Sequence, residues 1–310
     1  MKKLGLIPVI LLALFAGAYA QTAQQFLNEG IQLYKNKQYN AAIPKFSEAI
    51  RLSPNATAPW YNRGQCYYYS GDLERAIADY SQALRLDPKY QDALFQRGLA
   101  RNKKKDHDGA IYDYTQGITL APADSQFWYN RGIAYEDKGS LDLALADYNE
   151  AIRLNPNYGK AFVNRGSVYY KKKQYDLALA DTNVAIRLDP ANPLIWNNRG
   201  MCYAGKNELD LALADHTQAI KLDPNYVKGY LDRGIIYNKK KNNDQAVIEL
   251  TQAIKIDPNY VNAYLMRGAI YFDTKKYALS KADIDKVLQL APSNKLANDI
   301  KAKIAALPKT

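Results

Sequence analysis

A side-chain amide returns at one constant interval along much of this chain of 310 residues. The residues that carry it are Asn28, Asn62, Gln96, Asn130, Asn164 and Asn198. A primary amide has donors and an acceptor, so it can pair with the N–H and C=O groups of any peptide backbone. Gathered on one surface, these amides would bind an extended segment of a partner protein. The alternative is that they are soluble surface residues without a ligand.

Tyrosines close to the amides favour the binding interpretation. They are Tyr61, Tyr68, Tyr129 and Tyr170. Aromatic side chains are typical anchors at protein interfaces. We therefore predict one peptide-binding surface, on which the amides capture the backbone and the tyrosines set the preference for particular side chains.

A charged residue directly follows each of these amides, and a residue of opposite charge stands at a second fixed interval after it. Examples are the pairs Arg63 and Asp79, Arg131 and Asp147, and, with both signs reversed, Glu29 and Lys45. Because both signs change together, the pattern predicts an ion pair within each copy, with a structural role. The alternative is a row of arginines that binds an anionic ligand.

Proline and glycine keep the same interval as the amides, in eight copies each. The prolines are Pro54, Pro88, Pro122, Pro156, Pro190, Pro224, Pro258 and Pro292, and the glycines include Gly30, Gly64, Gly98, Gly132, Gly166, Gly200, Gly234 and Gly268. Such regularity is a property of the fold. Within each copy, apolar residues recur at helical spacing before and after a turn, and the proline ends the second helix.

This pattern resembles the tetratricopeptide repeat (TPR) family. If Ala23 is position 1, position 4 is large in every copy, position 8 is glycine, position 20 is alanine in seven copies and position 32 is proline. The units are 23–56, 57–90, 91–124, 125–158, 159–192, 193–226, 227–260 and 261–294. The resemblance implies an all-α, right-handed superhelical solenoid of eight helix pairs, whose first helices line a concave side.

The rotation of about 100° per residue in an α-helix decides which positions of each first helix share a face. At this rotation, positions 2, 5, 6, 9, 12 and 13 lie together, and this side should be the concave wall. The amides occupy position 6. A further helix over residues 295–307 should cap the array, with Leu296, Ile300, Ile304 and Leu307 in one apolar stripe.

Residues 1–20 have the three parts of a signal peptide: a basic start, an apolar run and the small-residue pattern AYA. We expect cleavage between Ala20 and Gln21 and a periplasmic or secreted protein. The apolar run is short for a membrane span of about 20 residues.

The formal net charge of +11 and three runs of three lysines suggest a second function. The runs, at 103–105, 171–173 and 239–241, fall at turns and would line one edge of the array. The simpler interpretation is that these lysines only keep the protein soluble. The alternative is an envelope-associated module that binds anionic lipid or polysaccharide, with salt-sensitive affinity. Export makes nucleic acid an unexpected partner.

Catalytic and metal-binding patterns are not found in the sequence. It has no nucleophile–base arrangement, phosphate-binding glycine loop or metal-ligand spacing, so we expect neither an enzyme nor a cofactor. His107 lies between Asp106 and Asp108, but adjacent turn residues rarely converge on one ion. Cys66 and Cys202 are four repeats apart, roughly 30–40 Å, too far for a disulfide. We expect buried thiols.

Overall fold

The computed structural model describes residues 6–307, with side chains from residue 21 onwards, and in this part every regular element is an α-helix. Contacts between residues divide the chain into two compact units, which meet between Pro156 and Asn157. The first unit contains α1 (Leu6–Lys35), α2 (Tyr39–Leu52), α3 (Thr57–Tyr69), α4 (Leu73–Leu86), α5 (Gln91–Lys103), α6 (His107–Leu120), α7 (Ser125–Asp137) and α8 (Leu141–Leu154). These helices follow the predicted repeat units.

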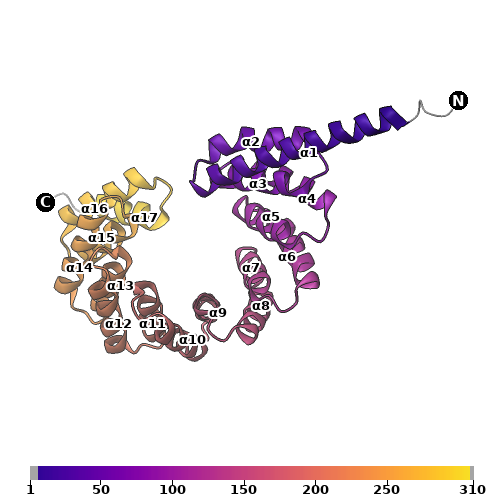
Figure 1. Cartoon of the computed structure of the whole chain (residues 1–310). Helices are drawn as coiled ribbons and strands as arrows, with labels where there is room; N and C mark the ends of the chain where they lie inside the picture. Colours follow the sequence, from indigo (N-terminus) through magenta and orange to yellow (C-terminus); the bar gives the residue numbers. More distant parts are fainter. Residues whose placement is uncertain (1–5, 308–310) are drawn as a thin grey trace. The chain divides into compact units, whose positions relative to one another are not determined.

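The second unit continues the same pattern of helix pairs and adds a final helix (Figure 1). It contains α9 (Gly159–Lys171), α10 (Tyr175–Leu188), α11 (Pro193–Gly205), α12 (Leu209–Leu222), α13 (Val227–Lys239), α14 (Asn243–Ile256), α15 (Val261–Asp273), α16 (Tyr277–Leu290) and α17 (Lys295–Ala305). The protein is thus an all-α solenoid of helix pairs with a terminal helix, as the sequence predicts.

The first helices of neighbouring repeats contact one another inside each unit. In the first unit α3 contacts α5 and α5 contacts α7, and in the second α11 contacts α13 and α13 contacts α15. No two second helices make such contacts in the described part of the chain. Since the first helices lie closer together, each unit curves with its first helices on the concave side.

The turn inside each repeat depends on one residue with a left-handed backbone. In the second repeat this is Gly71, with φ of 86°, and its N–H bonds the C=O of Tyr68 while Asp72 N–H bonds the C=O of Tyr67. This is the Schellman arrangement that ends many helices. The side chain of Asp72 then caps α4 by accepting from Arg75 N–H. The other left-handed residues are Gly139 and the non-glycine residues Lys37, Lys105, Lys173, Asn207, Lys241 and Lys275.

Packing within each repeat brings position 24 of the second helix against the glycine at position 8 of the first. A Cβ atom on Gly132 would lie 2.7 Å from Cε1 of Tyr148, closer than real atoms approach. Gly98 lies under Tyr114 in the same way. Glycine is therefore required in these repeats because a ring lies directly on the helix.

The final helix covers the end of the core through Ala297 and Ile300, which are buried, and through Ile304, which packs against them. Leu296 is 49% exposed, so the predicted stripe was wrong for this residue. In α17 the side chains that are buried in the core start at Ala297, one residue after Leu296.

Helix α1 starts well before the first repeat, at Leu6. The predicted signal peptide therefore has residues 1–5 outside the described part of the chain, and the side chains of residues 6–20 are not described either. Its cleavage stays a prediction. No helix in the described part is both long and apolar enough to cross a membrane.

Candidate functional site

The predicted amides all lie on first helices, and two of them are held in a defined orientation by their own helix. The side-chain N–H of Asn62 donates to the C=O of Ala58 at 2.8 Å, and that of Asn130 donates to the C=O of Gln126 at 2.8 Å. Only the NH₂ end of an amide can make this bond, which settles its orientation. One N–H and the amide oxygen stay available for a ligand.

The other amides differ in their surroundings. Asn28 is exposed and accepts a bond of 2.9 Å from the side chain of Gln24. Gln96 is half-buried. Asn164 has interactions of its own, whereas Asn198 makes no side-chain hydrogen bond in the described part of the chain. The row is therefore not uniform, and its first four members lie in the first unit while Asn164 and Asn198 lie in the second.

The tyrosines at position 5 are packing residues more than surface anchors. The ring of Tyr61 lies 4.9 Å from that of Tyr90 and 5.9 Å from that of Tyr80, measured between centroids. Tyr129 similarly lies 5.9 Å from Tyr148. In the sixth repeat the same position is Asn197, which is fully buried. Position 5 was predicted for the concave wall, but its side chains pack against the second helix and the segment that leads into the next repeat.

The tyrosines at position 12 are more accessible. Tyr68 meets Tyr69 edge to face, and the ammonium of Lys103 lies 5.2 Å from the centroid of the Tyr68 ring. Tyr170 packs on Tyr175 at 5.7 Å. Burial raises the pKa of both position-12 hydroxyls, so they stay protonated and can donate hydrogen bonds at neutral pH.

A partly exposed aromatic cluster near the first two turns was missed by the sequence reasoning. Tyr39 stacks on Tyr69 with ring centroids 5.1 Å apart, and Tyr34 lies within 6.0 Å of both rings. Tyr69 is 53% exposed. The sequence could have revealed this cluster, because the three tyrosines occupy positions 12, 13 and 17 of consecutive repeats. These positions lie close to the turn between the two helices of a repeat.

The arginines at position 7 bind acidic residues inside their own repeats. Arg63 makes two bonds to the carboxylate of Asp79, at 2.7 Å and 2.9 Å. Hydrogen bonding to Asp79 raises the pKa of Arg63, while burial raises the pKa of Asp79. The two-pronged contact keeps both groups charged at neutral pH. The reversed pair of Glu29 and Lys45 is also present, at 2.7 Å.

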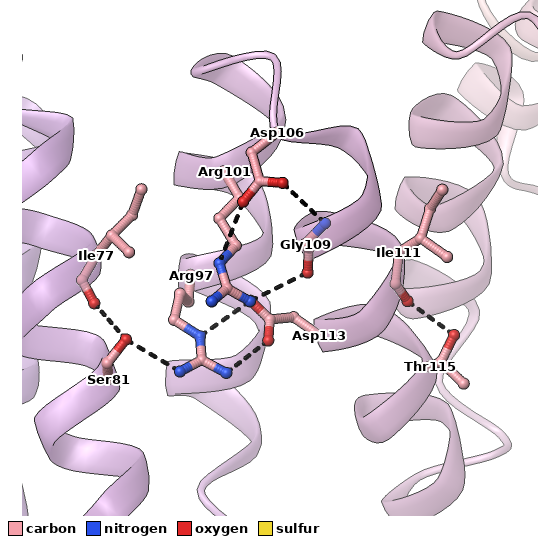
Figure 2. Close-up of polar contacts among 9 residues, drawn as sticks. All are labelled: Ile77, Ser81, Arg97, Arg101, Asp106, Gly109, Ile111, Asp113 and Thr115. Carbon is pink, nitrogen blue, oxygen red and sulfur yellow. Dashed lines mark hydrogen bonds and ion pairs between the residues drawn. The ribbon is translucent and has the colours of Figure 1, made fainter.

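Within each unit, the arginines of the described pairs also reach the preceding repeat, which the sequence reasoning did not anticipate. Figure 2 shows the third repeat, where Arg97 binds Asp113 and donates a bond of 3.0 Å to Ser81 of the second repeat. Ser81 in turn donates to the C=O of Ile77. The arginines are thus structural links, with their charge neutralised inside the fold.

The third repeat departs from the pattern in a way that the structure explains. Arg101 replaces the tyrosine of position 11 and donates to Asp113 at 2.8 Å and to the C=O of Gly109 at 3.2 Å (Figure 2). Asp113 therefore binds two arginines. His107 bonds the side chain of Asn102, and no group of three or more metal-binding side chains gathers among the described residues.

The lysine edge carries both signs of charge. In two of the runs, Lys104 contacts Glu74 at 2.6 Å and Lys240 contacts Asp210. Lys206, at the equivalent position of a repeat without a lysine run, contacts Asp176 at 2.7 Å. In each case the lysine after one first helix meets an acidic residue of the preceding repeat. The middle lysines of two runs are therefore paired, which gives these runs a role in joining repeats.

The two cysteines and the second histidine are buried. Burial raises the pKa of the Cys66 thiol to about 12 and that of Cys202 to about 12. His216 bonds Asn197 at 3.0 Å, and Asn197 donates to Asp232 at 2.8 Å. Burial lowers the pKa of His216 to about 4. The cysteines and His216 act as core side chains.

A cavity of about 250 Å³ opens in the second unit beside the amide row. Asn198 and Tyr170 line it, together with Ser167 and Met201 from the same first helices, and it reaches down to Cys202. Two of the predicted binding residues, one amide and one tyrosine, therefore meet at a single hollow.

Family models match the chain at its repeats. A model described as tetratricopeptide repeat matches residues 58–90, 125–158 and 193–226, one described as TPR repeat matches 166–207 and 234–275, and a further tetratricopeptide repeat model matches 261–294. Together these segments cover more than half of the chain.

Individual relatives share the fold over different lengths. A stretch of 51 residues is 37% identical to the E3 ubiquitin-protein ligase CHIP of Arabidopsis thaliana and covers 16% of this chain and only 18% of that ligase. A tetratricopeptide repeat protein from Parabacteroides merdae has a TM-score of 0.68 at 18% identity, covering 80% of this chain and 98% of its own. The APC/C Cut9–Hcn1 structure has a TM-score of 0.63 at 16% identity, covering 90% of this chain and 55% of that chain.

At these identities the solved structures are alike in fold only. The family models, by contrast, match the same periodic units that the helix pairs occupy. This chain belongs to the tetratricopeptide repeat family.

Proposed function

We propose that this protein is a noncatalytic scaffold that holds an extended segment of a partner protein against its first helices. TPR proteins bind protein or peptide partners and are generally noncatalytic. The observation that carries the proposal is the orientation of Asn62 and Asn130, whose amides are fixed by bonds to their own helices. A fixed amide loses little side-chain entropy when it binds, so its bonds to a peptide contribute more affinity.

The spacing of the amides fits an extended ligand. Neighbouring first helices lie roughly 8–10 Å apart, as packed helices do. An extended peptide rises about 3.3 Å per residue, so one amide would meet the ligand at about every third residue. Such contacts recognise the backbone, and the tyrosines at position 12 would add the preference for side chains.

The proposal includes export to the periplasm or exterior, which rests on the pattern of residues 1–20. The lysine edge does not enter it, because the middle lysines of two of its runs, Lys104 and Lys240, bind acidic residues of the preceding repeats. Anionic lipid or polysaccharide is therefore not proposed as a ligand.

The test is binding to a library of unstructured peptides, compared with a variant in which Asn62, Asn130, Asn164 and Asn198 are changed to alanine. Alanine is the best helix former, so the variant should fold. We expect its affinity for peptides to fall at least about tenfold, since each lost bond is worth about 1 kcal/mol. Binding by the parent protein should persist in high salt. Equal affinity of the two proteins, with helical content unchanged, would contradict the proposal.

A further inference from the structure

The cavity beside Asn198 lies in the repeat that has the smallest side chain at position 24, where four other repeats have a Phe or Tyr ring. Position 24 carries the residues Phe46, Tyr80, Tyr114, Tyr148, Thr182, His216, Leu250 and Ile284. Thr182 is the smallest of them. The methyl group of Thr182 would be 3.6 Å from a Cβ on Gly166, whereas ring atoms come within 2.9 Å at Gly64. The fifth repeat therefore leaves its glycine uncovered by a ring.

The position of the cavity matches the space that a ring occupies elsewhere. In the fourth repeat, the hydroxyl of Tyr148 reaches Glu136 at position 12, so the ring passes over Gly132 towards the first helix. The equivalent residues of the fifth repeat are Thr182, Gly166 and Tyr170, and all three line the cavity. The hollow thus runs along the path of the missing ring and opens beside the amide row.

The size and lining of the cavity suit an aromatic group. Its volume is about 250 Å³, and an engineered apolar cavity of about 150 Å³ in another protein is known to bind benzene. Met201 and the buried Cys202 give it soft apolar walls. Asn198, which lacks a hydrogen-bond partner in the described part, also lines the cavity, as does the exposed Lys228.

We propose that this cavity, the ring pocket, takes an aromatic side chain of the partner segment, with an acidic residue of that segment near Lys228. The inference rests on the proposed function, since the segment must lie along the first helices to present its ring. The partner's ring would occupy the space that Tyr148 fills in its own repeat, and Asn198 would bind the backbone beside it. Lys228 is exposed, so a carboxylate can reach it without displacing the fold.

The experiment fills the pocket from inside with Thr182→Phe, which gives the fifth repeat the residue that Phe46 provides in the first. This change should leave the protein folded and its unfolding temperature equal or higher, because it fills a cavity. Thr182→Val is the matched control, since it keeps the size of the side chain and leaves the pocket open. Both are compared with the parent protein.

Two probes distinguish binding of a ring in the ring pocket from binding of a peptide backbone by the amides. The first is a set of Gly- and Ser-rich peptides that differ at one central residue, Phe or Ala, flanked by glutamate. The second is 4-fluorophenol, a free ring followed by fluorine NMR. We expect the parent and Thr182→Val proteins to prefer Phe over Ala by about 10- to 100-fold, as the burial of one ring predicts. In Thr182→Phe the preference should fall to about one, while binding of the Ala peptide stays unchanged.

Each outcome has a definite meaning. A preference for Phe that survives in Thr182→Phe would overturn the ring pocket, and so would the absence of any preference in the parent. If no peptide binds, the proposed function fails, and the fluorophenol decides the pocket alone: loss of its binding in Thr182→Phe supports the pocket. Failure of fluorophenol to bind the parent would overturn the pocket in that case.

Discussion

The hydroxyl of Tyr148 donates a hydrogen bond of 2.8 Å to the carboxylate of Glu136 across the fourth repeat. Tyr80 occupies the same position two repeats earlier, and its hydroxyl is buried without a partner among the described residues. Tyrosine thus occupies position 24 once with a hydrogen-bonded hydroxyl and once with an unpaired one. The same substitution, tyrosine to phenylalanine, can measure the difference in stability between the two sites.

Tyr80→Phe should raise the free energy of unfolding or leave it unchanged, because it removes a buried hydroxyl that costs about 1–3 kcal/mol of desolvation. Tyr148→Phe should lower it by roughly 1–3 kcal/mol, since it removes a bond to a charged acceptor. Urea unfolding of both variants measures the difference. Equal losses would show that Tyr80 has a partner.

The ion pair of Arg131 and Asp147 should be costly to break. The side chain of Asp147 is 5% exposed, so Asp147→Asn leaves a largely buried arginine unpaired and should cost about 3–5 kcal/mol. Glu29→Gln is the control, because Glu29 and Lys45 are 38% and 39% exposed and solvent screens their attraction, so the loss should be much smaller. Chemical unfolding of both variants gives the two losses.

The reversed pair of the first repeat suggests a rescue of the same site. The double variant Arg131→Glu with Asp147→Lys should recover part of the stability lost in Asp147→Asn, as measured by the same unfolding curves. Recovery is expected to be partial, because Thr115 loses the bond that it receives from Arg131. A double variant less stable than Asp147→Asn would mean that orientation of the charges matters more than their pairing.

The buried histidine should make stability depend on pH. The folded pKa of His216 is about 4, below its usual value of 6.5, so between these values the unfolded chain binds more protons. The free energy of unfolding should therefore rise by up to about 3 kcal/mol as pH increases from 4 to 6.5. His216→Phe should reduce this slope, even though Asn197 loses its partner at every pH.

His107 supplies the control, because it is the only other histidine of the chain and is not buried. His107→Gln is measured beside His216→Phe across the same pH range. Burial raises the pKa of Asp232, whose carboxylate accepts a bond from Asn197. The informative quantity is therefore the difference in slope between the two variants. No difference would show that His216 accepts a proton in the folded protein.

The left-handed turns offer a test of backbone strain. Lys105 has φ of 66°, which is unfavourable for a residue with a Cβ, so Lys105→Gly should stabilise the protein by about 0.5–1 kcal/mol after the entropy of glycine is subtracted. Gly139→Lys is the reverse change, at a site where no atom lies within 4 Å of the added Cβ. It should destabilise by a similar amount in thermal unfolding.

The repeat period made most of the fold predictable, because proline, glycine and alanine at fixed positions leave a helix pair few ways to pack. The pairing of Arg63 with Asp79 was predictable for a similar reason, since the chain itself reverses the charges in Glu29 and Lys45. These inferences concern residues whose partners lie within one repeat.

Contacts beyond a single helix pair were harder to predict. A helix treated alone places Tyr61 on the concave wall, but Tyr90, at the entry to the next repeat, packs on its ring. The bond from Arg97 to Ser81 was missed for the same reason. The small size of Thr182 was visible in the sequence, because four earlier repeats carry Phe or Tyr at the same position. That the resulting hollow is also lined by Asn198 and Tyr170 needed the structure.

The bonds that these arginines make to the repeat before them also bear on how the protein comes apart. Arg63 joins the second repeat to the first, and Arg267 joins the eighth to the seventh, so each of these boundaries loses a charged donor when one repeat melts. At the far end Lys301 replaces the arginine and binds Asp285 through a single contact, in which the two side chains are 52% and 37% exposed. Unfolding should therefore spread between neighbours and start at α17, which would exchange its amide hydrogens first.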